Sequence, residues 1–178
     1  KNGSCNAPLR GGKSDVWVAL VFESDAGLEQ AQSLFDRVYD HWKKLPPDDR
    51  PELYLHGISQ GALVSMASID LFEMVAEPID GAVWAGPPFG SDLWSRATRA
   101  RDPGSPYWLP VVNEGEFVRF VNQNPANLTR GSAAWGRVRA VFLQYGSDPI
   151  VFFDPLAALR RPPFMQAQPP AEADRSAC

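Results

Sequence analysis

The chain has 178 residues, of which 44% are hydrophobic and 21% charged, and its formal net charge is −4 at pH 7. This balance predicts one folded domain and argues against a disordered chain or a nucleic-acid-binding protein. The longest wholly apolar run, Val16 to Phe22, is too short to span a bilayer, and no signal peptide is recognisable.

The first half of the chain alternates between strand and helix patterns. Residues 1–13 are polar and Gly-rich, as in a leader or tag, and residues 15–24 have the β-branched and aromatic composition of a buried strand. A helix is predicted next because apolar residues recur at alternating steps of three and four, on one face. These residues are Leu28, Ala31, Phe35, Val38, Trp42 and Leu45. Pro46 and Pro47 end this helix.

The rest of the chain predicts three further strands, at residues 52–56, 80–86 and 138–146, and a helix over about 60–76. Residues 87–136 are interrupted by Gly and Pro and are interpreted as an excursion of loops and short helices. Residues 165–178 form a polar tail. The hydrolase-like domain is therefore predicted over residues 14–164. Strand–helix alternation of this kind indicates an α/β fold with a mainly parallel sheet and flanking helices.

The stretch Gly57-Ile58-Ser59-Gln60-Gly61 lies between a predicted strand and a predicted helix. A Gly-x-Ser-x-Gly turn in that position mounts a serine nucleophile on a strained backbone, and its two glycines keep the neighbouring backbone from clashing. The N–H of Gln60 is then a candidate oxyanion donor, reinforced by the positive end of the following helix. The alternative is a Gly-rich turn that carries a serine without a catalytic role.

Asp148 is the candidate acid partner of Ser59. It follows the predicted strand 138–146, and ligands of parallel sheets bind at the carboxyl ends of the strands. The alternative interpretation is an aspartate that caps the turn before Pro149. Asp154 is a competing acid, but its setting before Pro155 is more typical of a helix N-cap.

The sequence offers no well-placed general base to complete a catalytic triad with Ser59 and Asp148. Only two histidines exist, His41 and His56, and both precede Ser59. His41 is predicted on the partly exposed side of its helix, and His56, three residues before Ser59, is badly placed to meet both Ser59 and Asp148. No histidine follows Asp148, so a Ser-Asp-His triad cannot be completed from this sequence.

Several longer stretches, in this order, resemble a bacterial α/β-hydrolase family whose members usually join this domain to an N-terminal membrane-embedded region. They are LFDRVYDHWKKLPPDDRPELYLHGISQGAL, GAVWAGPPFGSDLW, RDPGSPYWLPV and LQYGSDPIVFF. The resemblance covers about residues 28–164. It implies that Ser59 is the nucleophile and Asp148 the acid, that residues 86–94 and 101–108 wall the site, and that the parent protein is associated with the cell envelope or membrane.

The chain departs from the family pattern in three places. Gln60 replaces the usual leucine after the serine, and neither the upstream Thr/Gly-rich loop nor the C-terminal His-containing segment of the family is evident. The chain therefore resembles a partial α/β-hydrolase fold with both ends missing or replaced.

Two functions remain open at this stage. One is a serine esterase or lipase acting on a small-molecule acyl ester, by hydrolysis or by acyl transfer; the other is a non-catalytic hydrolase-fold module.

No cofactor, metal site or nucleic-acid partner is predicted, because no CxxC, His/Cys cluster, GxGxxG or Walker-type loop is present. The two cysteines, Cys5 and Cys178, stand at opposite ends of the sequence, and their pairing stays open. The basic clusters at 96–101 and 159–164 are interpreted as solvated surface rather than phosphate sites.

Overall fold

The computed structural model describes residues 24–154, 156–157 and 159–162. The strand predicted at 15–24, both cysteines, and the leader and tail segments lie outside these residues, apart from Ser24 at the start of the first helix described. The elements in chain order are α2 (Ser24–Lys43), η1 (Pro47–Asp49), β1 (Tyr54–Ile58), α3 (Gln60–Ala67), α4 (Leu71–Ala76), β2 (Gly81–Ala85), α5 (Asp92–Arg99), η2 (Asn113–Gly115), β3 (Val118–Val121), η3 (Pro125–Thr129) and β4 (Ala140–Leu143).

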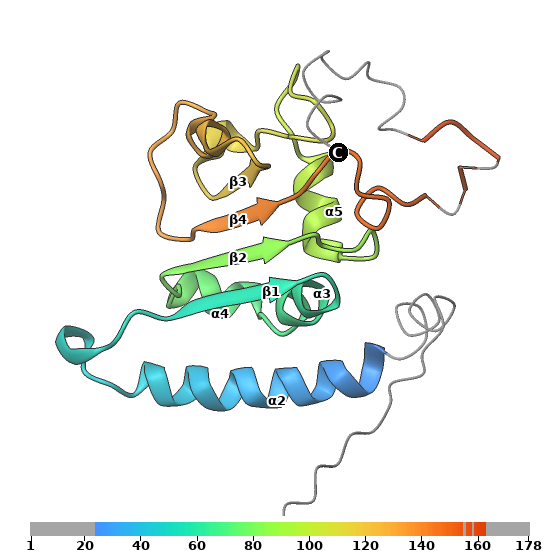
Figure 1. Cartoon of the computed structure of the whole chain (residues 1–178). Coiled ribbons are helices and arrows are strands. Elements are labelled where there is room, and N and C mark those ends of the chain that lie inside the picture. The colour runs from blue at the N-terminus through green and yellow to red at the C-terminus, as the bar shows by residue number, and fades with distance from the viewer. Residues whose placement is uncertain (1–23, 155, 158, 163–178) are drawn as a thin grey trace, which may run out of the picture.

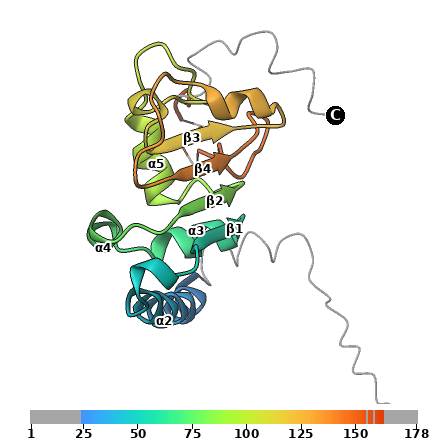
Figure 2. The same cartoon turned by 90° about the vertical axis from the view of Figure 1, so that its left-hand side faces the viewer.

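The described strands form one sheet in the order β1-β2-β4-β3, and all the pairings are parallel (Figure 1). The predicted class, an α/β fold with a parallel sheet and flanking helices, is confirmed. α2 runs along the β1 end of the sheet, and β3 lies at the other end (Figures 1 and 2). All four strands therefore direct their carboxyl ends to the same edge.

One face of the sheet carries the main core. Trp84, Phe142 and Phe120 lie on three neighbouring strands, are at most 2% exposed, and have ring centroids 5.3 and 5.0 Å apart along the row. α3 and α5 lie on this side of the sheet (Figure 2). On the opposite face Tyr54 and Ile58 are exposed, because successive side chains of a strand point to opposite faces. The stabilising burial is thus concentrated on one face.

The first described helix is shifted from its prediction and uses a different residue in its core face. Tyr39 is buried, whereas Val38 is 44% exposed. The Tyr39 ring stacks on those of Phe35 and Trp42, and its hydroxyl donates to the carbonyl oxygen of Glu77 at 2.6 Å. Spacings of four and three place Phe35, Tyr39 and Trp42 on one helix face, just as spacings of three and four do for the predicted series with Val38. Tyr39 takes the buried position, where a carbonyl oxygen accepts its hydroxyl.

The single helix predicted over 60–76 is wrong, because the chain leaves the helix at Ser68 and begins α4 at Leu71. The N–H and Oγ of Ser68 both donate to the carbonyl of Val64, and the Oδ1 of Asp70 accepts from the N–H of Glu73. Serine and aspartate side chains compete with helical hydrogen bonds in this way.

The region 87–136 contains the short helix α5, as predicted, but also the edge strand β3, which the prediction of loops and short helices missed. β3 is short and carries Arg119 in its middle, so it has no apolar run from which a strand could be predicted. The Arg119 guanidinium donates to the carbonyls of Gly115, Leu128 and Ala133 and stacks on Trp135 at 4.0 Å. These tertiary contacts make a charged residue compatible with a strand.

Candidate active site

Ser59 lies between β1 and α3, at the carboxyl edge of the sheet. Its backbone has φ 52° and ψ −120°, a conformation that non-glycine residues rarely adopt. The N–H of Ser59 still donates to the carbonyl of Ala85 on β2 at 2.8 Å, and its carbonyl accepts from the N–H of Ala62 at 2.9 Å. The strained backbone expected at Ser59 is therefore present, with sheet pairing on one side and helix pairing on the other.

The two glycines that flank Ser59 have different roles. A Cβ on Gly57 would lie 2.5 Å from the carbonyl oxygen of Gly61 and 2.7 Å from the Cα of Ala62, both of them backbone atoms that cannot move alone. A Cβ on Gly61 would meet no described atom within 4 Å. The prediction that both glycines prevent a clash by lacking a side chain is thus correct for Gly57 and wrong for Gly61, whose contribution is the close approach of its backbone.

Gln60 is the first residue of α3. The N–H groups of a helix's first turn have no acceptor within the helix, and they form its positive end. The Gln60 N–H thus lies at the positive end of α3, and its role as an oxyanion donor stays a prediction from the sequence motif.

Asp148 follows β4 and uses its two carboxylate oxygens differently. Oδ1 accepts from the N–H of Ile150 at 2.8 Å and from that of Val151 at 3.3 Å. Oδ2 points toward Gly86, at 3.6 Å from where a Cβ on that glycine would lie. The turn-capping interpretation of Asp148 thus holds for one oxygen, while the other oxygen is directed to the end of β2.

A hollow of about 240 Å³ contains both predicted residues. Its lining is largely apolar and consists of Ile58, Ser59, Ala85, Gly86, Leu143, Tyr145, Asp148 and Ile150. These residues come from the ends of β1, β2 and β4, where a parallel sheet gathers ligand-binding groups. The structure therefore brings Ser59 and Asp148 to one cavity, although 88 residues separate them in the sequence.

Gly86 lines the cavity at the end of β2, and the sequence predicted no specific role for it beyond its place in the segment 86–94. Its φ of +55° favours glycine, and the Gly-Pro pair directly after a strand was the available signal. The expectation that residues 86–94 and 101–108 wall the site is wrong apart from Gly86. Phe89, Trp94 and Tyr107 of those segments line a separate hollow.

Neither histidine lines the Ser59–Asp148 cavity. His41 is exposed on α2, as predicted, and His56 is exposed on β1. Asp154, the competing acid, accepts from the N–H of Leu156 at 2.8 Å and so caps a turn. The described residues that line the cavity therefore include two hydroxyls, of Ser59 and Tyr145, and one carboxylate, of Asp148, but no imidazole.

The part of the chain that the structure describes lacks two other kinds of feature. No three His, Cys, Asp or Glu side chains gather in a geometry that would hold a metal ion. None of the described helices has the length and apolar character needed to cross a membrane.

A parallel sheet flanked by helices, with a serine at a strained strand–helix junction and an aspartate at the end of a later strand, defines an α/β protein of the hydrolase-fold class. The chain belongs to the alpha/beta-hydrolase family, whose model matches residues 13–177. This match extends beyond residues 28–164, over which the motifs resemble the family. No curated protein and no solved structure matches the chain.

Proposed function

We propose that the protein is a serine hydrolase of the esterase or lipase type, with a nucleophile elbow at residues 57–61. The observation that carries this proposal is the shared cavity: Ser59, on a strained backbone between strand and helix, lines the same 240 Å³ hollow as Asp148. Strained backbone conformations concentrate at functional sites, and the family assignment supports a hydrolase fold.

Each residue has a role in this proposal. The Oγ of Ser59 attacks the carbonyl carbon of an ester, and the Gln60 N–H donates to the oxyanion that forms. A general base, which no described residue of the cavity supplies, takes the Ser59 proton and gives it to the leaving oxygen, so that an alcohol departs. Water then releases the acid from the acylated serine. Oδ2 of Asp148 orients the base, because Oδ1 already accepts two backbone N–H groups.

The substrate is proposed to be an ester with an apolar acyl group. Ile58, Leu143 and Ile150 line the cavity and give it an apolar wall beside Ser59. Apolar walls with a few placed polar groups are typical of small-molecule sites. The same machinery supports transfer of the acyl group to an alcohol or thiol instead of water. We place this function in one domain, residues 14–164, with residues 1–13 and 165–178 flanking it.

A second candidate function is a non-catalytic module with a hydrolase fold. The observation that favours it is that neither His41 nor His56 lines the cavity that contains Ser59. In this case the cavity binds its ligand without turnover.

A fluorophosphonate probe tests the first proposal directly, because it reacts with an activated serine. We expect one adduct on Ser59, located by mass spectrometry, and no adduct in Ser59→Ala. Ser147→Ala is the matched control, since Ser147 is an exposed serine at the same edge of the sheet and its loss leaves labelling intact. A folded protein that is never labelled at Ser59 would refute the hydrolase proposal.

The two candidates also differ in pH dependence. Hydrolysis of a p-nitrophenyl ester that rises steeply between about pH 6 and 8 indicates an imidazole base and excludes the non-catalytic module. A weak rate without that rise supports the module, because oxyanion and binding interactions alone still give some acceleration.

A further inference from the structure

A second hollow, of about 430 Å³, lies on the other side of the turn that Asp148 begins. Ile150 of this turn lines the Ser59 cavity, whereas Val151 and Asp154 line the second hollow. Its volume is in the range of small-molecule sites. Half of its lining residues are aromatic: Phe89, Trp94, Tyr107, Phe152 and Phe153.

The five aromatic residues form the aromatic wall of the hollow, and three of their rings are in contact with one another. The ring centroid of Phe152 lies 5.9 Å from that of Trp94, edge to face, and 6.1 Å from that of Tyr107. Trp94 is held in place because its N–H donates to Oε1 of the buried Gln144 at 2.6 Å. Trp94 and Phe152 are buried, whereas Phe153 is 44% exposed and Phe89 and Tyr107 are partly exposed, so these last three rings are the ones that a planar aromatic ligand meets.

The same hollow gathers arginines from the two basic clusters of the sequence. Arg99 comes from the cluster 96–101 and Arg160 from the cluster 159–164, and both line the cavity. Arg99 has no ion pair with any described residue. The carboxylate of Asp154 lies 3.8 Å from Arg160, and its other oxygen caps the N–H of Leu156. The lining therefore carries an excess of positive charge.

Tyr107 adds a neutral hydrogen-bond donor to this charge. Burial raises the pKa of its phenol, an effect opposed by Arg101 and Arg99, so the hydroxyl stays protonated at neutral pH. The Arg101 guanidinium lies 5.3 Å from the centroid of the Tyr107 ring. The lining of the hollow thus combines cations with a hydroxyl donor.

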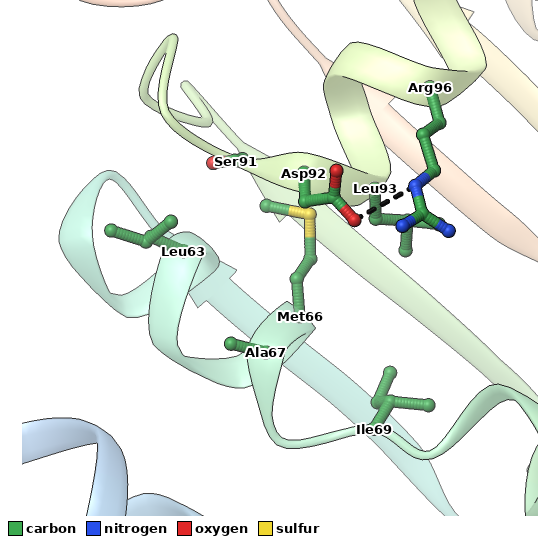
Figure 3. Close-up of a pocket in the computed structure, with 8 residues that line it drawn as sticks. All are labelled: Leu63, Met66, Ala67, Ile69, Ser91, Asp92, Leu93 and Arg96. Atoms are coloured by element: carbon green, nitrogen blue, oxygen red, sulfur yellow. Dashed lines mark ion pairs between the residues drawn. The ribbon is translucent and has the colours of Figure 1, made fainter. Parts of the chain in front are cut away.

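A neighbouring hollow of about 280 Å³, between α3 and α5, shows what distinguishes this one (Figure 3). Its arginine, Arg96, is paired with Asp92 at 2.9 Å, and Leu63, Met66 and Leu93 give it an apolar lining. In Figure 3 the Ser91 hydroxyl points away from that ion pair. The α3–α5 hollow is therefore charge-balanced, although its arginine lies on the same helix as Arg99.

We propose that the hollow lined by Arg99 and Arg160 binds an aromatic carboxylate. The ligand's ring packs among the aromatic side chains, and its carboxylate accepts from the arginines. A guanidinium matches a carboxylate because its planar fork donates two parallel hydrogen bonds. This site is distinct from the Ser59 cavity and does not depend on the proposed hydrolase activity.

Calorimetric titration of the full chain with 2-naphthoate tests the ligand class. We expect 2-naphthoate to bind, and both the neutral analogue 2-naphthalenemethanol and the aliphatic anion decanoate to bind at least about tenfold more weakly. Equal binding of the alcohol would overturn the role of the arginines, and equal binding of decanoate would overturn the role of the aromatic wall. Absence of 2-naphthoate binding would overturn the proposal as a whole.

Variants of the two lining arginines, with a control on the helix that carries Arg99, test the location. Arg99→Gln and Arg160→Gln should each weaken 2-naphthoate binding about tenfold, because each removes a charged hydrogen bond. Arg96→Gln is the matched control, and its affinity should stay within about twofold. Arg99→Lys keeps the charge without the fork and should fall between Arg99→Gln and the parent. Unfolding curves check that each variant is folded, and unchanged affinity of Arg99→Gln and Arg160→Gln would place the ligand elsewhere.

Ser59→Ala separates this site from the proposed active site. Its affinity for 2-naphthoate should equal that of the parent chain. Loss of binding in Ser59→Ala would overturn the second site, whereas failure of fluorophosphonate labelling would overturn only the hydrolase proposal.

Discussion

Ser59 and Asp148 lie at the ends of different strands, and the chain holds their junctions in different ways. The Ser59 junction depends on backbone crowding, since Gly57 lies so close to Gly61 and Ala62 that no Cβ fits. The Asp148 turn depends on one side chain, whose Oδ1 accepts two backbone N–H groups. Substitution of Gly57 should therefore disrupt the Ser59 junction, and substitution of Asp148 itself should disrupt the second junction.

At the Ser59 junction, the residues that fix the backbone differ from the residue proposed to react. At the Asp148 turn, one residue has both roles. Ser59 can be changed while its backbone keeps the same shape, because the shape is imposed by its neighbours. Asp148 shapes its own turn through Oδ1 and presents Oδ2 to the site. Substitutions at the two junctions should accordingly differ in how stability and reactivity change together.

The largest effect is expected for Gly57→Ala. The added methyl group overlaps backbone atoms of α3, so strand and helix must separate, and the free energy of unfolding should fall by about 3 kcal/mol. Chemical denaturation measures this change, and fluorophosphonate labelling of Ser59 should be lost with it. Gly90→Ala is the control, since a Cβ there meets no described atom within 4 Å. Full stability of Gly57→Ala would show that the junction relaxes freely.

Removing the Asp148 carboxylate should have the next largest effect. Asp148→Ala leaves the N–H groups of Ile150 and Val151 without their acceptor, and loss of such a cap costs about 1–2 kcal/mol of unfolding free energy. Asp148→Asn keeps an acceptor oxygen and should lose less than about 0.5 kcal/mol, while its labelling by the probe slows. Equal destabilisation by both variants would mean that charge, and not the cap, stabilises the turn.

Gly61→Ala should change stability slightly and in the opposite direction. Its Cβ meets open space, and alanine loses less conformational entropy than glycine in a helix, so the free energy of unfolding should rise by about 0.5 kcal/mol. Probe labelling of Ser59 should continue. A destabilised Gly61→Ala would give the two glycines equivalent roles after all.

The smallest effect is expected for His56→Gln. The side chain is exposed and lies outside the lining of the Ser59 cavity, so stability should stay within about 0.5 kcal/mol. The rate of labelling, followed from pH 6 to 8, should also match that of the parent chain. A lost pH dependence in His56→Gln would identify this residue as the base.

The sequence was sufficient for features that depend on neighbouring residues. The strand before Ser59, the turn at Gly57 and the helix after Gln60 form one continuous stretch, and the apolar spacing of α2 is visible within twenty residues. Asp148 was also predictable, because parallel strands bring their carboxyl ends to one edge. The sequence did not show that one oxygen of Asp148 caps its own turn while the other faces Gly86.

Features that depend on distant contacts were missed. Arg119 is compatible with β3 only because carbonyls and a tryptophan from elsewhere in the chain receive its guanidinium. Tyr39 takes the place of Val38 in the core because the carbonyl of Glu77, just after α4, accepts its hydroxyl. Neither partner is adjacent in sequence, so a local pattern carries no signal of it.

The sequence by itself determined the α/β class, the strand–Ser59–helix junction and the residue types available for chemistry, because these follow from local spacing and local backbone sterics. Only the tertiary structure decided that Ser59, Gly86 and Asp148 share one cavity and that Arg99 and Arg160 share another. The physical reason is that the side chains of each cavity come from separate elements, which meet only when the core between them is packed.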